Sequence, residues 1–401
     1  MKAGWQVKKL QEVVDSSCSL SYGIVQPGED FQDGLPIVRP VDLTSKFIAL
    51  SGLKRINPIF AESYKRTNLS GNEILMCVRG NTGVVSIASQ ELNGANVTRG
   101  IVPIRFDSKK INHLFGFYIL SSDYVQKQIK EKTYGAALMQ INISDLKNIN
   151  IHFPEEKEQR RIVAILDEAF ADIAAAKEKA EQNLKNAKEV FEAHLQGIFA
   201  TPKPDWQTKK IGDICKSIEY GTSSKSQKSG KVPVLRMGNI QDGKLDWSDL
   251  VYSDNLDEIE KYSLRNGDVL FNRTNSAEHV GKTAIFRGEQ KAISAGYLIR
   301  INVKKNIINP EFLAIYLNSR KIREYGFSVM TSSVNQANIS GSKLKEYPFL
   351  MPPLSEQRQI VSQLDSLSAE TSSLESLYQQ KLSNLEELKK SLLQQAFSGA
   401  L

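Results

Sequence analysis

The sequence predicts an α+β protein built as a tandem repeat of two mixed α/β blocks, each followed by a long helix. Three observations carry this prediction. The decapeptide EQRRIVAILD at 158–167 returns as EQRQIVSQLD at 356–365. Two basic segments alternate with two mildly acidic ones. The acidic segments place apolar residues three and four positions apart, which is typical of a helix that packs along one seam.

The repeat extends well beyond the decapeptide, as expected for a chain made of two similar halves. Its matched segments pair Arg39 with Arg236, Arg79 with Arg273, and Gln140 with Gln336. The segments are LPIVRPVDL (35–43) with VPVLRMGNI (232–240), GNEILMCVRG (71–80) with NGDVLFNRTN (266–275), QINIS (140–144) with QANIS (336–340), and LKNINIHFP (146–154) with LKEYPFLMP (344–352).

The charge is unevenly divided along the chain. Residues 1–153 hold 18 Lys and Arg against 13 Asp and Glu, and residues 204–350 hold 22 against 16. Residues 154–203 hold 8 against 10, and residues 351–401 hold 4 against 6. Two basic blocks in repeated positions indicate a polyanionic partner, because the excess positive charge lies in the blocks and not on the helices.

Each basic block is predicted to mix strands with a helical segment. The runs VVSIAS (84–89), GKTAIF (281–286) and YLIRINV (297–303) are rich in residues that favour strands. The segments 112–129 and 310–326 show apolar residues at helical spacing.

The long helices are predicted to begin at Pro154 and near Ser355, and to end before Pro202 and Gly399. Neither apolar stripe is stable in water alone, so the two helices are predicted to pack as an antiparallel coiled coil with a pseudo-twofold arrangement. The stripes are Ile162, Leu166, Ala169, Ile173, Ala176, Ala180, Leu184, Ala187, Phe191 and Leu195 on the first helix, and Ile360, Leu364, Leu367, Leu374, Tyr378, Leu385, Leu388 and Leu392 on the second.

Several classes of protein are excluded. No apolar run reaches the roughly 18 residues of a transmembrane helix, and the N-terminus lacks the apolar core of a signal peptide, which predicts a cytoplasmic protein. The cysteines Cys18, Cys77 and Cys215 stand far apart, and the four histidines show no ligand spacing. We therefore expect neither disulfides nor a metal site.

Two partial catalytic motifs fail on inspection. The segment NPIF (57–60) resembles a motif of amino-methyltransferases, but Ile59 replaces its second proline and no Gly-rich cofactor loop accompanies it. The GKT of HVGKTA (279–284) lacks the glycine that a phosphate-binding loop needs, because Ser276 stands there. The chain is predicted to be non-catalytic.

Two similar blocks, each followed by a helix that opens with a proline and then EQR-x-IV-x2-LD, resemble the DNA-specificity subunits of type I restriction–modification systems. The resemblance implies target-recognition domains at 1–153 and 204–350, with a central conserved helix at 154–203 and a C-terminal one at 351–401. Each recognition domain would read one half of a bipartite double-stranded DNA site. The helices would set the unread spacer between the two halves.

The resemblance also implies the partners and their cofactors. Two modification subunits would carry S-adenosylmethionine and methylate adenine, and up to two restriction subunits would use ATP and Mg²⁺ to cleave DNA. The chain itself would bind none of these cofactors.

Candidate DNA-reading residues are the polar and basic loop residues of the two blocks, since Arg and Lys suit guanine or phosphate, and Asn and Gln suit adenine. Arg39 and Arg236, beside β runs, instead suit structural ion pairs, and Gln140 and Gln336 suit a shared backbone contact as well as DNA. The candidates are Arg79, Asn81, Thr82 and Arg99 in the first block, and Lys225, Lys228, Arg273, Thr274, Asn275 and Lys282 in the second.

Partner docking is expected off the apolar stripes, although local capping and ion pairing near the helix start explain the same polar residues. The candidates are Glu158, Gln159, Arg160, Glu356, Gln357 and Arg358. Two alternative functions stay open. They are a self-contained DNA methyltransferase with an unrecognised cofactor loop, and a coiled-coil scaffold that binds no nucleic acid.

Overall fold

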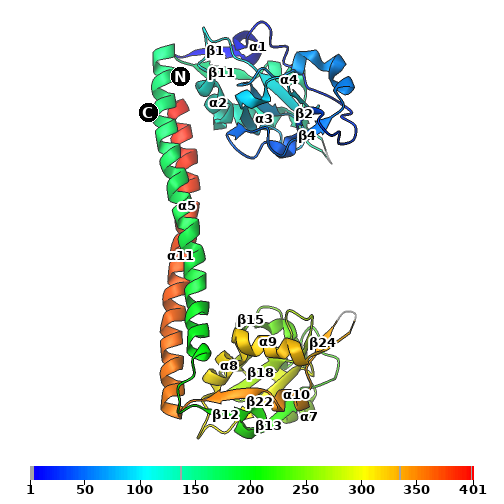
Figure 1. The fold of residues 1–401 in the computed structure, drawn as a ribbon, viewed down its shortest axis with the longest axis vertical. Coiled ribbons are helices and arrows are strands. Elements are labelled where there is room, and N and C mark those ends of the chain that lie inside the picture. The colour runs from blue at the N-terminus through cyan, green and yellow to red at the C-terminus, as the bar shows by residue number, and fades with distance from the viewer. Residues whose placement is uncertain (1–3, 136–137, 334–335, 399) are drawn as a thin grey trace. The chain divides into compact units, whose positions relative to one another are not determined.

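The computed structural model describes residues 4–135, 138–333, 336–398 and 400–401. The chain forms two compact units (Figure 1). Unit 1 comprises Met1–Ala180 and Gln380–Leu401, and unit 2 comprises Glu181–Gln379. The long helices α5 (Glu156–Ala200) and α11 (Leu354–Ser398) therefore each contribute to both units.

Unit 1 contains short strands and helices that are closely spaced along the chain. The strands are β1 (Gln6–Lys9), β2 (Leu35–Val38), β3 (Phe47–Ile48), β4 (Lys54–Ile56), β5 (Ile74–Cys77), β6 (Val85–Ala88), β7 (Asn96–Val97), β8 (Ile101–Ile104), β9 (Thr133–Tyr134), β10 (Gln140–Ile141) and β11 (Asn150–Phe153). The helices besides the long pair are α1 (Leu10–Val13), α2 (His113–Ser121), α3 (Asp123–Lys132) and α4 (Ile143–Lys147). The main sheets have the orders β3-β6-β5-β8 and β4-β2-β7, and β1 pairs with β11.

Unit 2 repeats this plan with one more hairpin. The strands are β12 (Gln207–Lys210), β13 (Cys215–Tyr220), β14 (Val232–Leu235), β15 (Ile240–Gln241), β16 (Lys244–Leu245), β17 (Val251–Ser253), β18 (Asp268–Asn272), β19 (Thr274–Asn275), β20 (Thr283–Phe286), β21 (Ile293–Ser294), β22 (Leu298–Val303), β23 (Thr331–Ser332), β24 (Ala337–Asn338) and β25 (Pro348–Met351). The helices are α6 (Ile211–Ile214), α7 (Leu256–Tyr262), α8 (Pro310–Asn318), α9 (Arg320–Val329) and α10 (Gly341–Lys345). Its main sheets have the orders β13-β22-β18-β20 and β17-β14-β21, and β12 pairs with β25.

The predicted tandem repeat is confirmed at the level of topology. In each unit the first strand pairs antiparallel with the strand that precedes a long helix, as β1 with β11 and β12 with β25. A parallel pair also recurs, as β2 with β7 and β14 with β21. The three predicted strand runs form β6, β20 and β22.

Each predicted helical segment is two helices, not one. The break falls at Ser122 in unit 1 and at Ser319 in unit 2, where the backbone is extended. In both places the serine hydroxyl donates 2.6 Å back to a carbonyl three residues earlier, of Ile119 and of Tyr316. This local bond competes with continuation of the helix. The prediction from apolar spacing therefore joined two shorter helices into one.

The long helices follow the predicted bounds closely. Ser355 lies inside the first turn of α11 and does not cap it, because the helix begins at Leu354. Gly399, the predicted stop, lies outside the described residues, and α11 ends at Ser398. No helix among the described residues combines the length and apolar character needed to cross a membrane.

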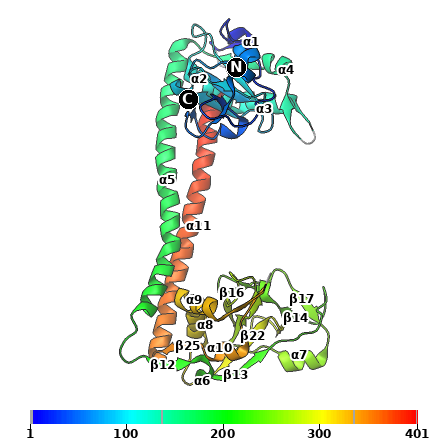
Figure 2. The same ribbon diagram turned by 45° about the vertical axis from the view of Figure 1, so that its right-hand side comes forward.

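Within each unit the start of one long helix packs beside the end of the other, so the two run antiparallel (Figures 1 and 2). In unit 1, Lys177 of α5 forms a 2.7 Å ion pair with Glu386 of α11. The small residues Ala180 and Ala187 are buried, which permits close approach of the helices. The predicted stripe is wrong at Leu374 and Leu388, whose side chains are 42% and 46% exposed.

An aromatic residue near the end of each long helix enters the core of one unit. Phe199 of α5 packs edge-on against Tyr316 in unit 2, with ring centroids 5.1 Å apart. Phe397 of α11 packs edge-on against Phe115 in unit 1, at 5.3 Å. Helix α8 carries Tyr316 and contacts β18 and β20, so it joins the sheet of unit 2 to the helix pair (Figure 2).

The end of α11 is also held by a buried histidine of unit 1. Nε2 of His152, on β11, lies 3.0 Å from the carbonyl oxygen of Phe397, so this nitrogen carries the proton and donates. Burial lowers the pKa of His152 below its ordinary 6.5, although the bond to Phe397 acts in the opposite direction. Burial lowers the pKa of His113 as well.

These two shifts predict that acid destabilises unit 1. A histidine with a lowered pKa binds fewer protons in the folded than in the unfolded chain, so its stabilisation is complete above pH 6.5 and is lost as the pH falls through the lowered pKa. The slope reaches at most about 1.4 kcal/mol per pH unit for each histidine. Denaturation of the full chain between pH 7.5 and 5.0 measures this pH dependence of the free energy of unfolding, and hydrogen exchange localises the effect. The variant His152→Gln should show a smaller slope, and an unchanged slope would contradict the assignment.

Candidate nucleic-acid interface

A small polar β-ribbon forms at one edge of unit 2. Its strand order is β19-β24-β23, and all neighbours are antiparallel. Thr274 pairs with Asn338, and Asn275 pairs with Ala337. Asn, Thr and Ser make up most of these strands, so the ribbon presents hydrogen-bonding groups rather than an apolar face. Strands β23 and β24 of this ribbon form a two-stranded hairpin, and a two-stranded β-ribbon fits the major groove of duplex DNA.

Two predicted readers, Arg273 and Thr274, are used inside the chain to hold this ribbon. The amide of Asn338 donates to Thr274 Oγ1 at 2.7 Å and accepts from Arg273 Nη2 at 3.3 Å. The guanidinium of Arg273 also lies 4.7 Å from the ring centroid of Tyr220 and donates to the carbonyl of Gly296. Thr274 is buried. Both side chains thus anchor the ribbon.

Beside the ribbon lies a polar pocket of about 480 Å³. It brings together the predicted readers Asn275 and Lys282. Residues from distant parts of the chain complete its wall. Two of them were singled out from the sequence, Arg236 for a structural ion pair and Gln336 for a backbone contact as well as DNA. The remaining lining residues are Met237, Gly238, Ile240, Gln241, Asp249, His279 and Tyr297.

The loop before β20 is shaped by Gly281. Its N–H donates 2.7 Å to the carbonyl of Asn272, and Asn272 N–H donates 2.8 Å to the carbonyl of Lys282. Gly281 has φ +88°, and a Cβ there would lie 3.0 Å from Nη1 of Arg323. The turn therefore requires glycine. The GKT segment leads into a strand and not into a helix, which agrees with the rejection of a phosphate-binding loop.

Unit 1 carries the corresponding ribbon. Hairpin β9–β10 lies beside the segment at Arg79, which bridges antiparallel to Gln140. Gly80 N–H donates 2.8 Å to the carbonyl of Met139, and Thr82 Oγ1 donates to the same carbonyl at 3.3 Å. The bridge gives Gln140 a backbone contact, but unit 2 pairs Thr274 with Asn338 at the corresponding place, so the two glutamines do not make the same contact. In unit 2, Gln336 directly precedes the paired strand β24.

A broad hollow of about 790 Å³ lies next to this ribbon in unit 1. It holds the predicted readers Asn81 and Thr82. Helix α3 supplies cationic and amide groups that were not among the predicted readers, because the spacing of its apolar residues indicated only a helix. The other lining residues are Gly80, Val84, Asp123, Gln126, Lys127, Ile129, Lys130, Thr133 and Met139.

Six of the predicted readers line neither hollow. Arg273 and Thr274 anchor the ribbon of unit 2, and the backbone of Arg79 bridges to Gln140 in unit 1. The other three are Arg99, Lys225 and Lys228. Arg99 is exposed, and its backbone N–H donates to Ile24 O at 2.8 Å. Lys225 and Lys228 are exposed on the segment that follows Gly221.

The ion pairs predicted for the matched arginines are confirmed. Arg39 binds Asp42 at 2.9 Å, and Arg236 binds Asp249 at 3.0 Å. Hydrogen bonding to Asp42 raises the pKa of Arg39 above its ordinary value. Arg236 therefore places a positive charge beside the exposed carboxylate of Asp249 at the pocket of unit 2.

The two glutamines of the EQR triplets are buried, and the structure gives them a structural role in place of the expected docking role. Oε1 of Gln159 accepts from Asn112 N–H at 2.7 Å, and its Nε2 donates to the carbonyls of Lys110 and Pro154, both at 2.9 Å. A side chain with all these groups paired inside the chain offers nothing to a partner subunit.

Gln357 makes the matching set of bonds in unit 2. Its Oε1 accepts from Asn309 N–H at 2.8 Å, and its Nε2 donates to the carbonyls of Ile307 and Pro352 at 3.0 and 2.9 Å. Each glutamine thus fixes the start of a long helix to the segment that caps α2 or α8. The repeated motif is a repeated structural joint.

The charged residues of the triplets differ in their surroundings. Arg160 is exposed and pairs with Glu156 at 2.6 Å, and Glu158 pairs with Arg161 at 2.7 Å. Glu356 accepts from Trp206 Nε1 at 3.1 Å and pairs with Lys203. Local ion pairing, the alternative to partner docking, is therefore present at Glu158, Arg160 and Glu356. Arg358 is exposed.

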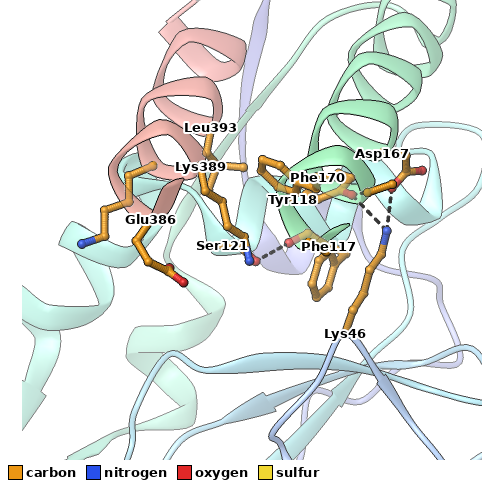
Figure 3. Close-up of a pocket in the computed structure, with 12 residues that line it drawn as sticks. Lys46, Phe117, Tyr118, Ser121, Asp167, Phe170, Glu386, Lys389 and Leu393 are labelled. Carbon is orange, nitrogen blue, oxygen red and sulfur yellow. Dashed lines mark hydrogen bonds and ion pairs between the residues drawn. The ribbon is translucent and has the colours of Figure 1, made fainter. Parts of the chain in front are cut away.

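A further pocket, of about 620 Å³, lies in unit 1 against the long helices (Figure 3). Lys46 Nζ contacts Asp167 at 2.6 Å and the hydroxyl of Tyr118 at 2.9 Å, and that hydroxyl bonds to Asp167. Burial raises the pKa of Tyr118, with the bond to Asp167 acting in the same direction, so Tyr118 stays protonated and donates. In unit 2 the residue that corresponds to Tyr118 is Ile315, which has no hydroxyl group. This cluster is therefore not part of the repeat.

The described residues contain no group of His, Cys, Asp or Glu placed to hold a metal ion. Cys77 and Cys215 are buried, and burial raises the pKa of both thiols, that of Cys215 to about 12.

Solved structures share the fold of this chain. A chain from work on complex assembly and conformational transition of the type I R-M system superposes with a TM-score of 0.78 at 20% identity, covering 100% of this chain and 99% of that chain. The HsdS subunit from Thermoanaerobacter tengcongensis superposes with a TM-score of 0.65, also at 20% identity, and covers 100% and 98%. At this identity the likeness shows a common fold.

The family model for the type I restriction modification DNA specificity domain matches residues 2–186 and again 203–384. The chain therefore belongs to this family and contains its domain twice.

Curated relatives carry the same description. The type I restriction enzyme EcoKI specificity subunit of Escherichia coli (strain K12) is 28% identical over 300 residues, which cover 71% of this chain and 64% of the relative. The putative type I restriction enzyme MjaX specificity subunit of Methanocaldococcus jannaschii is 34% identical over 171 residues, covering 41% and 40%. The matched part of this chain thus spans less than two thirds of each of these relatives.

Proposed function

We propose that the chain is the non-catalytic DNA-specificity subunit of a type I restriction–modification system, with each unit reading one half of a bipartite duplex site. The observation that carries the proposal is the recurrence of a polar ribbon, flanked by amide and cationic side chains, in both units of a family member. Two equivalent recognition units on one chain suit a DNA site with two specified parts.

The charge distribution supports the same function. Both recognition blocks are net basic, and the helical regions are net acidic. Lys and Arg contacts to phosphate give affinity that falls steeply as salt is raised, while side chains at base edges give sequence preference. A scaffold that binds no nucleic acid has no need for this partition.

A stand-alone methyltransferase is less well supported. The side chain of Asn57, in the segment that resembles a methyltransferase motif, accepts from Ile59 N–H at 3.1 Å and caps the 3₁₀ helix Pro58–Thr67. The oxygen of that amide is therefore occupied by a local structural bond. In the proposed function, adenine methylation belongs to two modification subunits that carry S-adenosylmethionine, and cleavage belongs to restriction subunits that use ATP and Mg²⁺.

Mapping methylated adenines in a host genome with and without this gene tests the proposal. We expect the gene to add methylation at a split motif of two short specified sequences separated by a spacer of unspecified bases. A continuous motif, or no change, would contradict the proposal. Binding of S-adenosylmethionine by the purified chain alone would favour the methyltransferase instead, and no duplex affinity at low salt would favour the scaffold.

A further inference from the structure

The polar side chains around the ribbon of unit 2 fall into two groups. In the first group the side chains are bonded within the chain, as for Arg273, Thr274 and Asn338. In the second group, among the residues that the structure describes, Lys282 Nζ and the side-chain amide of Gln336 form no hydrogen bond or ion pair with the protein. The second group therefore has its hydrogen-bonding capacity available for a ligand.

Both available side chains line the polar pocket beside the ribbon. Lys282 is held by the backbone bonds of its turn, where Asn272 N–H donates 2.8 Å to the Lys282 carbonyl. Gln336 accepts from Ser333 N–H at 2.7 Å through its own carbonyl and precedes the paired residue Ala337. Backbone hydrogen bonds at both residues give the two side chains defined starting positions, which favours specific recognition.

The chemistry of the two side chains differs and so does the base that each suits. An ammonium only donates, which matches the O6 and N7 acceptors of guanine. A free primary amide both donates and accepts, which matches N6 and N7 of adenine. Asn275 is less suited to adenine, because its Oδ1 already accepts from Ser276 N–H at 2.8 Å. Tyr297, 48% exposed, adds an aromatic surface to the same wall.

We propose that Lys282 and Gln336 are specificity-determining residues of unit 2, reading a guanine and an adenine, while Arg273, Thr274 and Asn338 are positioning residues that hold the ribbon. This assignment rests on the proposed function and deepens it. In this assignment the bases of one half-site are read by Lys282 and Gln336 in the pocket, and not by Arg273.

The test is selection of bound sequences from a randomised duplex DNA library by the full-length chain and two variants, Gln336→Met and Lys282→Met. We expect each variant to lose discrimination at one base position of one half-site by roughly tenfold to a hundredfold, as for loss of a bidentate or paired base contact. The other positions of that half-site, and the whole of the other half-site, keep their preference.

Lys225→Met is the matched control, because Lys225 is an exposed lysine of the same unit outside the pocket. It should weaken binding to all sequences alike and reduce the salt dependence. Melting temperatures equal to that of the unaltered chain show that the variants are folded. Equal loss on all sequences for both methionine variants, or an unchanged motif, would overturn the assignment of these residues. Failure of the unaltered chain to select any split motif would instead overturn the proposed function.

Discussion

Replacing Phe397 by alanine is expected to lower the free energy of unfolding of unit 1 by about 3–5 kcal/mol, because removal of a buried aromatic ring loses its transfer free energy and leaves a cavity. Phe397 is 7% exposed and contacts Phe115, while its carbonyl oxygen accepts from His152. The ring is the last large apolar group of α11 within the core of unit 1. Chemical denaturation of the full chain, with hydrogen exchange resolved by segment, measures the loss.

The repeat supplies the matched experiment for this prediction. Phe199 occupies the corresponding place in unit 2, 2% exposed and within 5.8 Å of Phe312, measured between ring centroids. Phe199→Ala should reduce protection in unit 2, whereas Phe397→Ala should reduce it first in unit 1. Phe31→Ala is the control, because that ring is 47% exposed. A loss of less than about 1 kcal/mol for the buried pair would show that these rings are not core residues.

Replacing Gln357 by methionine is expected to lower the free energy of unfolding of unit 2 by about 2–4 kcal/mol. Methionine nearly matches glutamine in length, so the substitution mainly removes hydrogen bonds. Three backbone groups lose their partner, namely Asn309 N–H and the carbonyls of Ile307 and Pro352. The bond to Pro352 is buried, so its unpaired carbonyl costs about 1–3 kcal/mol, and the two partly buried bonds contribute about 0.5–1.5 kcal/mol each. Denaturant titration monitored by hydrogen exchange in α8 and the start of α11 tests this expectation.

Two controls separate the joint from its neighbours. Arg358→Ala changes an exposed side chain of the same triplet and should alter stability by no more than about 0.5 kcal/mol. Gln159→Met should reproduce the large loss in unit 1, where the same three kinds of backbone group depend on the side chain. If Gln357→Met changed stability as little as Arg358→Ala, the hydrogen bonds of Gln357 would not stabilise the start of α11. That result would favour the predicted partner-docking role for this glutamine.

The site was partly predictable. Asn275 and Lys282 were selected from sequence because amides and cations in polar loops suit base edges, and both line the pocket of unit 2. Arg273 satisfied the same rule, yet its guanidinium lies on the ring of Tyr220 and bonds to Asn338, which is 65 residues later in the chain. Residue type cannot distinguish a reading arginine from an anchoring one, because the difference depends on which partners the fold brings near it.

The sequence by itself determined the tandem repeat, the two long helices and the alternation of basic blocks with acidic helices. These features depend on local periodicity, on prolines at helix boundaries and on residue counts, all of which are properties of short stretches. Only the tertiary structure decided that Gln159 and Gln357 are buried joints, that Leu374 and Leu388 are exposed, and that Phe199 and Phe397 complete the cores. Burial and hydrogen bonding at these positions depend on residues far away in the chain, which no local pattern reports.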